Sequence, residues 1–78
     1  MEFVTVVEVI DGVASQVVLF QGEHSAIKEK AEDLFLNICR ENIWSFDTYS
    51  QTDIDNILAD GWEKWGDNSV SIVWPDVK

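Results

Sequence analysis

The sequence predicts one small α+β domain, a small antiparallel sheet with two helices packed on one face, in the order β-β-α-α-β. Three observations lead to this fold class. The chain has 78 residues, which suits a single domain spanning 1–78. Two runs rich in β-branched residues lie near the start, and two stretches with helically spaced apolar residues follow them. Helices on one face of a sheet are the economical packing of these elements.

A β-hairpin is predicted over the first 21 residues. Asp11-Gly12 stands between the two β-branched runs and is typical of a type I′ turn, because both turn positions need positive φ. This turn sets a register in which Val6 opposes Val17, so that Val6 and Val18 lie on opposite sheet faces. Both faces are then mostly apolar. Either both faces are covered, or one of them meets a partner.

A helix is predicted over residues 25–41. Its apolar residues follow the spacing of one buried stripe, and charged residues fill the remaining positions as solvated surface. Ser25 is expected to cap the N-terminus with its hydroxyl, and Asn42 marks the end. The stripe consists of Ile27, Ala31, Leu34, Phe35 and Ile38.

A second, shorter helix is predicted at about 52–60, after an aromatic-rich connection. Ser50 or Thr52 can cap it, with Asp53 or Asp55 as the acidic partner of a capping box. Gly61 stands where a left-handed cap is usual.

The last predicted strand covers residues 70–74. A turn at 66–69 precedes it, and Pro75 ends it because proline has no N–H to donate. We expect this strand to pair beside the first strand. Residues 62–65 form either one extra short strand or an extended loop.

Few residues suggest catalysis or metal binding. His24 is the only histidine, and no second His or Cys pair gives the spacing of a metal site. Cys39 is the only cysteine, and its position on a helix favours packing over a nucleophilic role. A calcium loop after Asp53 fails, because Ile57 and Leu58 stand where a ligand and a glycine are needed. The sequence therefore predicts a chain that is not an enzyme and holds no metal or cofactor.

The acidic balance narrows the class of partner. The chain carries 15 Asp and Glu against 5 Lys and Arg, a formal net charge of −10. Such a charge repels DNA, RNA and anionic lipid, and no apolar run reaches the ~18 residues of a membrane span. The lone cysteine and the acidic start, unlike that of a signal peptide, favour a cytoplasmic location. We expect a protein partner with a basic surface, toward which the charge steers the chain.

The predicted partner-binding site lies between residues 47 and 67. The acidic residues there are opposed only by Lys64, and two tryptophans stand among them, as aromatic anchors do in protein interfaces. Two alternatives remain open: the acids serve solvation alone, and the tryptophans belong to the core. The predicted site comprises Asp47, Asp53, Asp55, Asp60, Trp62, Glu63, Trp65 and Asp67.

The layout resembles that of small acidic proteins encoded on phages and other mobile elements. The shared features are a hairpin closed by Asp11-Gly12, a helix, a short helix ending in Ala59-Asp60-Gly61-Trp62, and a last strand after Gly66-Asp67-Asn68. Anti-CRISPR proteins, restriction inhibitors and nuclease-immunity proteins are drawn from this class. The resemblance implies a module that blocks or modulates a basic nucleic-acid-handling protein, as an inhibitor or partial nucleic-acid mimic, and it assigns no site residue.

A second hypothesis is a self-associating structural domain. An uncovered apolar sheet face would form a homodimer, and the charge would serve solubility only. Polar substitutions at Val6 and at Val18 are expected to separate the two hypotheses. If the chain forms a homodimer, one of these two substitutions should abolish dimerisation.

Overall fold

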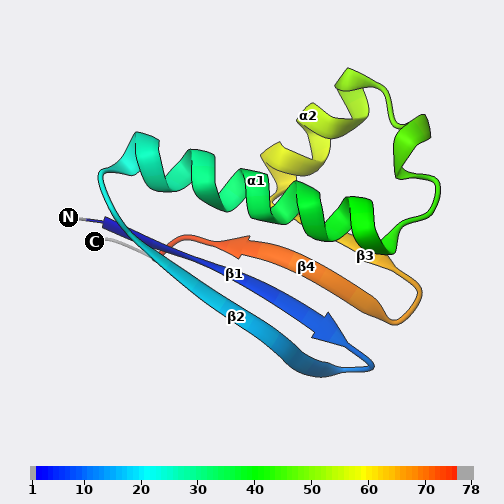
Figure 1. Ribbon diagram of the computed structural model, residues 1–78, viewed down its shortest axis with the longest axis horizontal. Coiled ribbons are helices and arrows are strands. Elements are labelled where there is room, and N and C mark those ends of the chain that lie inside the picture. Colours follow the sequence, from blue (N-terminus) through cyan, green and yellow to red (C-terminus); the bar gives the residue numbers. More distant parts are fainter. Residues whose placement is uncertain (1, 76–78) are drawn as a thin grey trace.

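The chain forms a four-stranded antiparallel sheet and two α-helices (Figure 1). The computed structural model describes residues 2–75. The predicted α+β class is confirmed, and residues 62–65 add the extra strand that the β-β-α-α-β order left open. In chain order the elements are β1 (Glu2–Ile10), β2 (Val13–Gly22), α1 (His24–Asn42), a short 3-10 helix η1 (Phe46–Thr48), α2 (Gln51–Asp60), β3 (Trp62–Trp65) and β4 (Asn68–Val73).

The β1–β2 hairpin turns at Asp11-Gly12, as predicted. Asp11 has φ 52° and Gly12 has φ 80°, the left-handed backbone that an Asp-Gly pair accepts readily. Ile10 pairs with Val13 directly beside the turn. The turn therefore fixes the local pairing that its residue types predict.

Farther from the turn the register differs from the prediction. A β-bulge between Glu8 and Val9 shifts the pairing by one residue, so that Val6 opposes Val18 instead of Val17. A shift of one residue moves each later side chain to the other face of the sheet. The prediction that Val6 and Val18 lie on opposite faces is therefore wrong, because both lie on the face that packs against α1.

β4 pairs antiparallel with β1, as predicted, and β3 pairs with the far side of β4. The sheet order is β2-β1-β4-β3, which leaves β2 and β3 as the two edge strands. Gly66, with φ 58°, provides the positive φ in the tight turn between β3 and β4.

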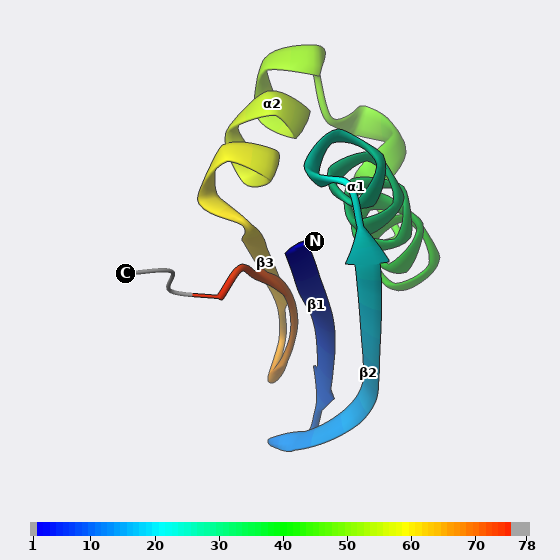
Figure 2. The same cartoon turned by 90° about the vertical axis from the view of Figure 1, so that its left-hand side faces the viewer.

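α1 is the long helix that lies along the sheet (Figure 1; seen nearly end-on in Figure 2), and it contacts β1, β2 and β4. It begins one residue earlier than predicted, and its N-cap is Glu23, whose side chain makes no capping hydrogen bond. The predicted Ser25 cap is therefore wrong, because Ser25 lies inside the first turn. At the other end the Asn42 side chain donates to the Ile38 carbonyl oxygen, 2.8 Å away.

The ends of α2 follow the predicted chemistry. The Ser50 hydroxyl accepts a hydrogen bond from the Asp53 backbone N–H (3.1 Å), and the Asp53 carboxylate accepts one from the Ser50 N–H (3.0 Å). This reciprocal pair is the predicted capping box. Gly61 ends the helix with φ 75°, in the left-handed region.

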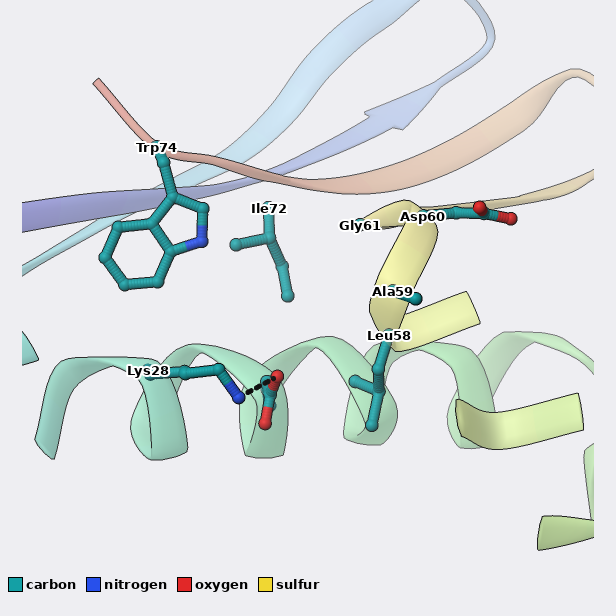
Figure 3. A pocket seen from close by; sticks show the side chains of 8 residues that line it. Lys28, Leu58, Ala59, Asp60, Gly61, Ile72 and Trp74 are labelled. Carbon is teal, nitrogen blue, oxygen red and sulfur yellow. Dashed lines mark hydrogen bonds and ion pairs between the residues drawn. The ribbon is translucent and has the colours of Figure 1, made fainter. Parts of the chain in front are cut away.

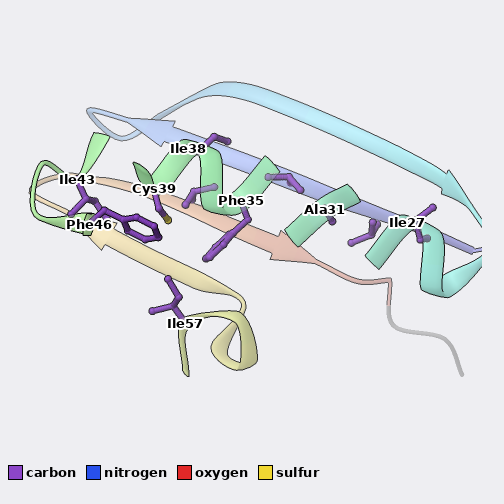
Figure 4. Close-up of a cluster of buried hydrophobic side chains, with 11 residues drawn as sticks. Ile27, Ala31, Phe35, Ile38, Cys39, Ile43, Phe46 and Ile57 are labelled. Carbon is purple, nitrogen blue, oxygen red and sulfur yellow. The ribbon is translucent and has the colours of Figure 1, made fainter. Parts of the chain in front are cut away.

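The core lies between α1 and one face of the sheet, with contributions from η1 and α2 (Figure 4). Four of the five residues predicted for the α1 stripe are buried, and Leu34 is partly buried. Within residues 2–75, no helix is both long enough and apolar enough to cross a membrane. The buried residues are Val4, Val6, Ile27, Ala31, Phe35, Ile38, Cys39, Ile43, Phe46, Ile57 and Val70.

Candidate binding surface

The sheet face turned away from the core forms a second surface, which we call the outer sheet face. Successive side chains of a strand point to opposite faces, so the pairing registers assign residues of all four strands to it. The core-facing residues Val4, Val6 and Val70 mark the opposite face. The outer sheet face comprises Phe3, Thr5, Val7 and Val9 of β1, Ala14, Val17, Leu19 and Gln21 of β2, Trp62 and Lys64 of β3, and Ser69, Ser71 and Val73 of β4.

Large apolar side chains on the outer sheet face are about half exposed. By contrast, Val4 and Val6 on the core side of β1 are 0% and 1% exposed. Soluble monomers rarely leave large contiguous apolar patches in water unless a partner uses them. The exposed fractions are 60% for Val17, 58% for Leu19, 52% for Trp62, 49% for Val73 and 44% for Phe3.

The outer sheet face is also separated from the negative charge of the chain. Among residues 2–75, Lys64 is its only charged residue and no acid lies on it. Three acids lie in strands, and all three are on the opposite face of the sheet: Glu2, Glu8 and Glu63. The other acids of residues 2–75 lie in helices, turns and connections. A chain of net charge −10 thus has one apolar face without acids among residues 2–75.

The acids of the predicted site do not share one surface. Asp47 lies in η1 and Asp67 in the turn between β3 and β4, whereas three others lie on α2. With about 100° of rotation per residue, Asp53 and Asp60 share one flank of α2 and Asp55 lies on the opposite flank. The structure therefore spreads the predicted acidic cluster over several parts of the molecule.

The two predicted anchors in β3 lie on opposite faces of the sheet. Trp62 belongs to the outer sheet face, whereas Trp65, an odd number of residues further on, packs against the core. Between them, Glu63 accepts a hydrogen bond from the Tyr49 hydroxyl (3.2 Å) on the core side. Burial, together with the Glu63 carboxylate, raises the pKa of Tyr49. One flat partner surface cannot contact both tryptophans as anchors.

The residues with catalytic potential are engaged in packing. Cys39 is 0% exposed, and burial raises the pKa of its thiol to about 12, with a smaller contribution from Glu63. The His24 ring stacks on Trp74 with centroids 4.7 Å apart, and its Nδ1 lies 2.7 Å from a carboxylate oxygen of Glu2. The part of the chain that the structure describes contains no group of three or more His, Cys, Asp or Glu placed to hold a metal ion.

A hollow of about 180 Å³ lies between α1, the end of α2 and β4 (Figure 3). Ile72 and Trp74 line it, and Lys28 at its edge forms an ion pair with Glu32 at 3.0 Å. Small-molecule sites usually enclose ~300 Å³ or more. The hollow is therefore a weaker candidate than the outer sheet face.

Four of the five half-exposed large apolar side chains of the outer sheet face were absent from the predicted site: Phe3, Val17, Leu19 and Val73. The signal that could have found them is the two-sided apolar pattern of the hairpin, which left open whether both faces are covered or one of them meets a partner. Comparison with known proteins assigns no family, because no protein-family model, curated protein or solved structure matches the chain.

Proposed function

We propose that the chain is a non-enzymatic protein-binding module that acts through its outer sheet face. The observation that carries this proposal is the gathering of five half-exposed large apolar side chains on a face without acids. Apolar burial contributes ~25 cal/mol per Å², so a partner that covers this face gains the main favourable term of association. Trp62 supplies the kind of aromatic anchor that dominates interface energies.

We infer further that both helices cover the same face of the sheet, so that the chain itself leaves the outer sheet face free. α1 contacts three of the strands, and α2 contacts β3 and contributes Ile57 to the same core as Val4 and Val70. The views in Figures 1 and 2, in which both helices lie above the strands, support this inference.

A second candidate function uses the acidic side of the molecule. Its supporting observation is that the charge is displaced from the outer sheet face onto the helices, turns and connections. These acids, although spread over several elements, would suit a partner with a basic surface, such as a nucleic-acid-handling protein in the cytoplasm, which the chain would block as the phage and mobile-element resemblance implies. Binding of this kind weakens steeply with salt, because the attraction is screened.

A matched pair of variants separates the two candidates. Val17 and Val13 lie on the same strand and are 60% and 67% exposed, but they occupy opposite faces of the sheet. Val17→Lys and Val13→Lys therefore add the same charge to the same strand. The experiment is a pull-down from a lysate of the source organism with tagged wild-type protein and both variants, at low and high salt, after circular dichroism has established that all three are folded.

If the outer sheet face binds the partner, Val17→Lys loses the captured protein, Val13→Lys retains it, and high salt does not release it. If the acidic side binds instead, both variants capture the same protein and salt elutes it. The second result would contradict the proposed function and support the second candidate.

A further inference from the structure

We propose that the occupant of the outer sheet face is a second copy of this chain, stacked sheet against sheet in a two-fold homodimer. This inference rests on the proposed function above, and it names the partner. Three features of the face support it: its area, its charge and the distribution of its side chains.

The area of the face is near what a specific dimer needs. Four strands about 4.8 Å apart, with about seven residues each at about 3.3 Å, cover roughly 19 by 23 Å. Two stacked faces therefore bury roughly 900 Å² in projection, and the relief of the side chains adds to this value. Specific interfaces begin at about 1,200 Å² of accessible surface, so the face has to be covered almost entirely, which a surface of equal size achieves.

The charge of the face favours a copy of the chain over a basic protein. A basic partner needs carboxylates at the contact, and within residues 2–75 this face offers none. Stacked sheets lie about 10 Å apart, and the strand acids Glu2, Glu8 and Glu63 of each copy lie on the opposite face of the sheet. With a screening length of about 8 Å at physiological ionic strength, repulsion between the two acidic layers is weak.

The side chains complement one another under a two-fold rotation. Val17 pairs with Val7, Val7 with Ser71, and Ser71 with Trp62, so these residues form one row across the sheet. The row has its largest side chain, Trp62, at the β3 edge and a branched aliphatic side chain at the β2 edge. A two-fold axis parallel to the strands exchanges the edges and places Trp62 of each copy over Val17 and Leu19 of the other.

Sedimentation equilibrium over a concentration series tests the proposal, with wild type, Val17→Lys and Val13→Lys at low and high salt. We expect a wild-type dimer whose dissociation constant rises more than about tenfold in Val17→Lys, because an ammonium group then loses water at each of two symmetric positions. Val13→Lys should dimerise like wild type. Higher salt should strengthen the dimer, because it screens the repulsion between two chains of net charge −10.

Two tryptophan variants test the arrangement. Trp62→Ala should weaken the dimer, whereas Trp44→Ala should leave it unchanged, because Trp44 is 93% exposed on the connection after α1 and lies off the sheet. A wild type that stays monomeric at every concentration overturns the homodimer, as does a dimer that survives Val17→Lys or dissociates in high salt. If wild type is monomeric while Val17→Lys loses another protein in the pull-down, the homodimer fails and the proposed function stands.

Discussion

Cys39 should make the fold sensitive to alkaline pH. Its side chain is fully buried, and the pKa of the thiol is raised from 9.0 to about 12. Above pH 9 the unfolded chain therefore gives up a proton that the folded chain keeps. The stability that the neutral thiol contributes is complete below pH 9 and is lost as the pH rises toward 12.

The size of this loss follows from the two pKa values. At pH 11 the unfolded thiol is two pH units beyond its pKa, while the folded thiol is still mostly neutral. Wild type should therefore lose about 3 kcal/mol between pH 8 and pH 11 through this group alone. Since a domain of this length has roughly 4–12 kcal/mol of stability in total, the effect should be readily measurable.

Urea unfolding of wild type and Cys39→Ala, followed by circular dichroism at pH 8 and pH 11 in reducing buffer, measures the loss. Cys39→Ala should be about 1–2 kcal/mol less stable at pH 8, because it leaves a small cavity, but it should lose less on going to pH 11. Titrating groups that do not interact with Cys39 contribute equally to both proteins and cancel in the comparison, whereas the raised pKa of Tyr49 depends in part on Cys39. A parallel decline of the two proteins would show that the Cys39 thiol does not cause the loss of stability.

Three further substitutions test the packing and the caps by urea unfolding. Phe35→Ala removes the largest fully buried side chain and should cost about 3–5 kcal/mol; a loss below about 1 kcal/mol would show that this side chain is not in the core. Ser50→Ala breaks the capping box of α2 and should cost about 1 kcal/mol, whereas Thr52→Ala, which removes no cap, should change little. Gly61→Ala places a Cβ on a backbone with φ 75° and should cost about 1 kcal/mol; an unchanged midpoint would contradict the left-handed cap.

The hairpin turn and the two ends of α2 could be predicted from the sequence because each depends on a few neighbouring residues, whereas the predicted Ser25 cap of α1 was wrong. Asp11-Gly12, the Ser50–Asp53 pair and Gly61 each require a particular backbone or hydrogen bond, and each residue type reveals that need. The long helix was predictable for a similar reason, since its apolar spacing extends over several turns.

The bulge in the hairpin could not be predicted in the same way. Glu8 pairs with Gln16 and Val9 pairs with Ala14, which leaves Ser15 without a paired residue on β1 in the strand ladder. A bulge of this kind requires no particular residue type. The adjacent valines at 17 and 18 also make either register equally apolar, so the hydrophobic pattern does not decide between them.

The candidate site was harder to predict because the sequence alone does not show on which face of the sheet each residue lies. Trp62 and Trp65 are three residues apart, a spacing that shares a face on a helix but separates faces on a strand. Their stretch was predicted as either a strand or a loop, so their orientation stayed undecided. The apolar pattern of the hairpin allowed an uncovered face as one of two alternatives, but the absence of acids from that face in residues 2–75 emerges only when the four strands are paired.

The most direct test of the homodimer through the outer sheet face is a dilution series followed by NMR of valine and leucine methyl groups. If the homodimer forms, the methyl signals of Val17, Leu19 and Val73 shift with protein concentration, while those of the buried Val4 and Val6 stay fixed. Signals that do not change with concentration, or changes confined to α2 and its acids, would contradict it.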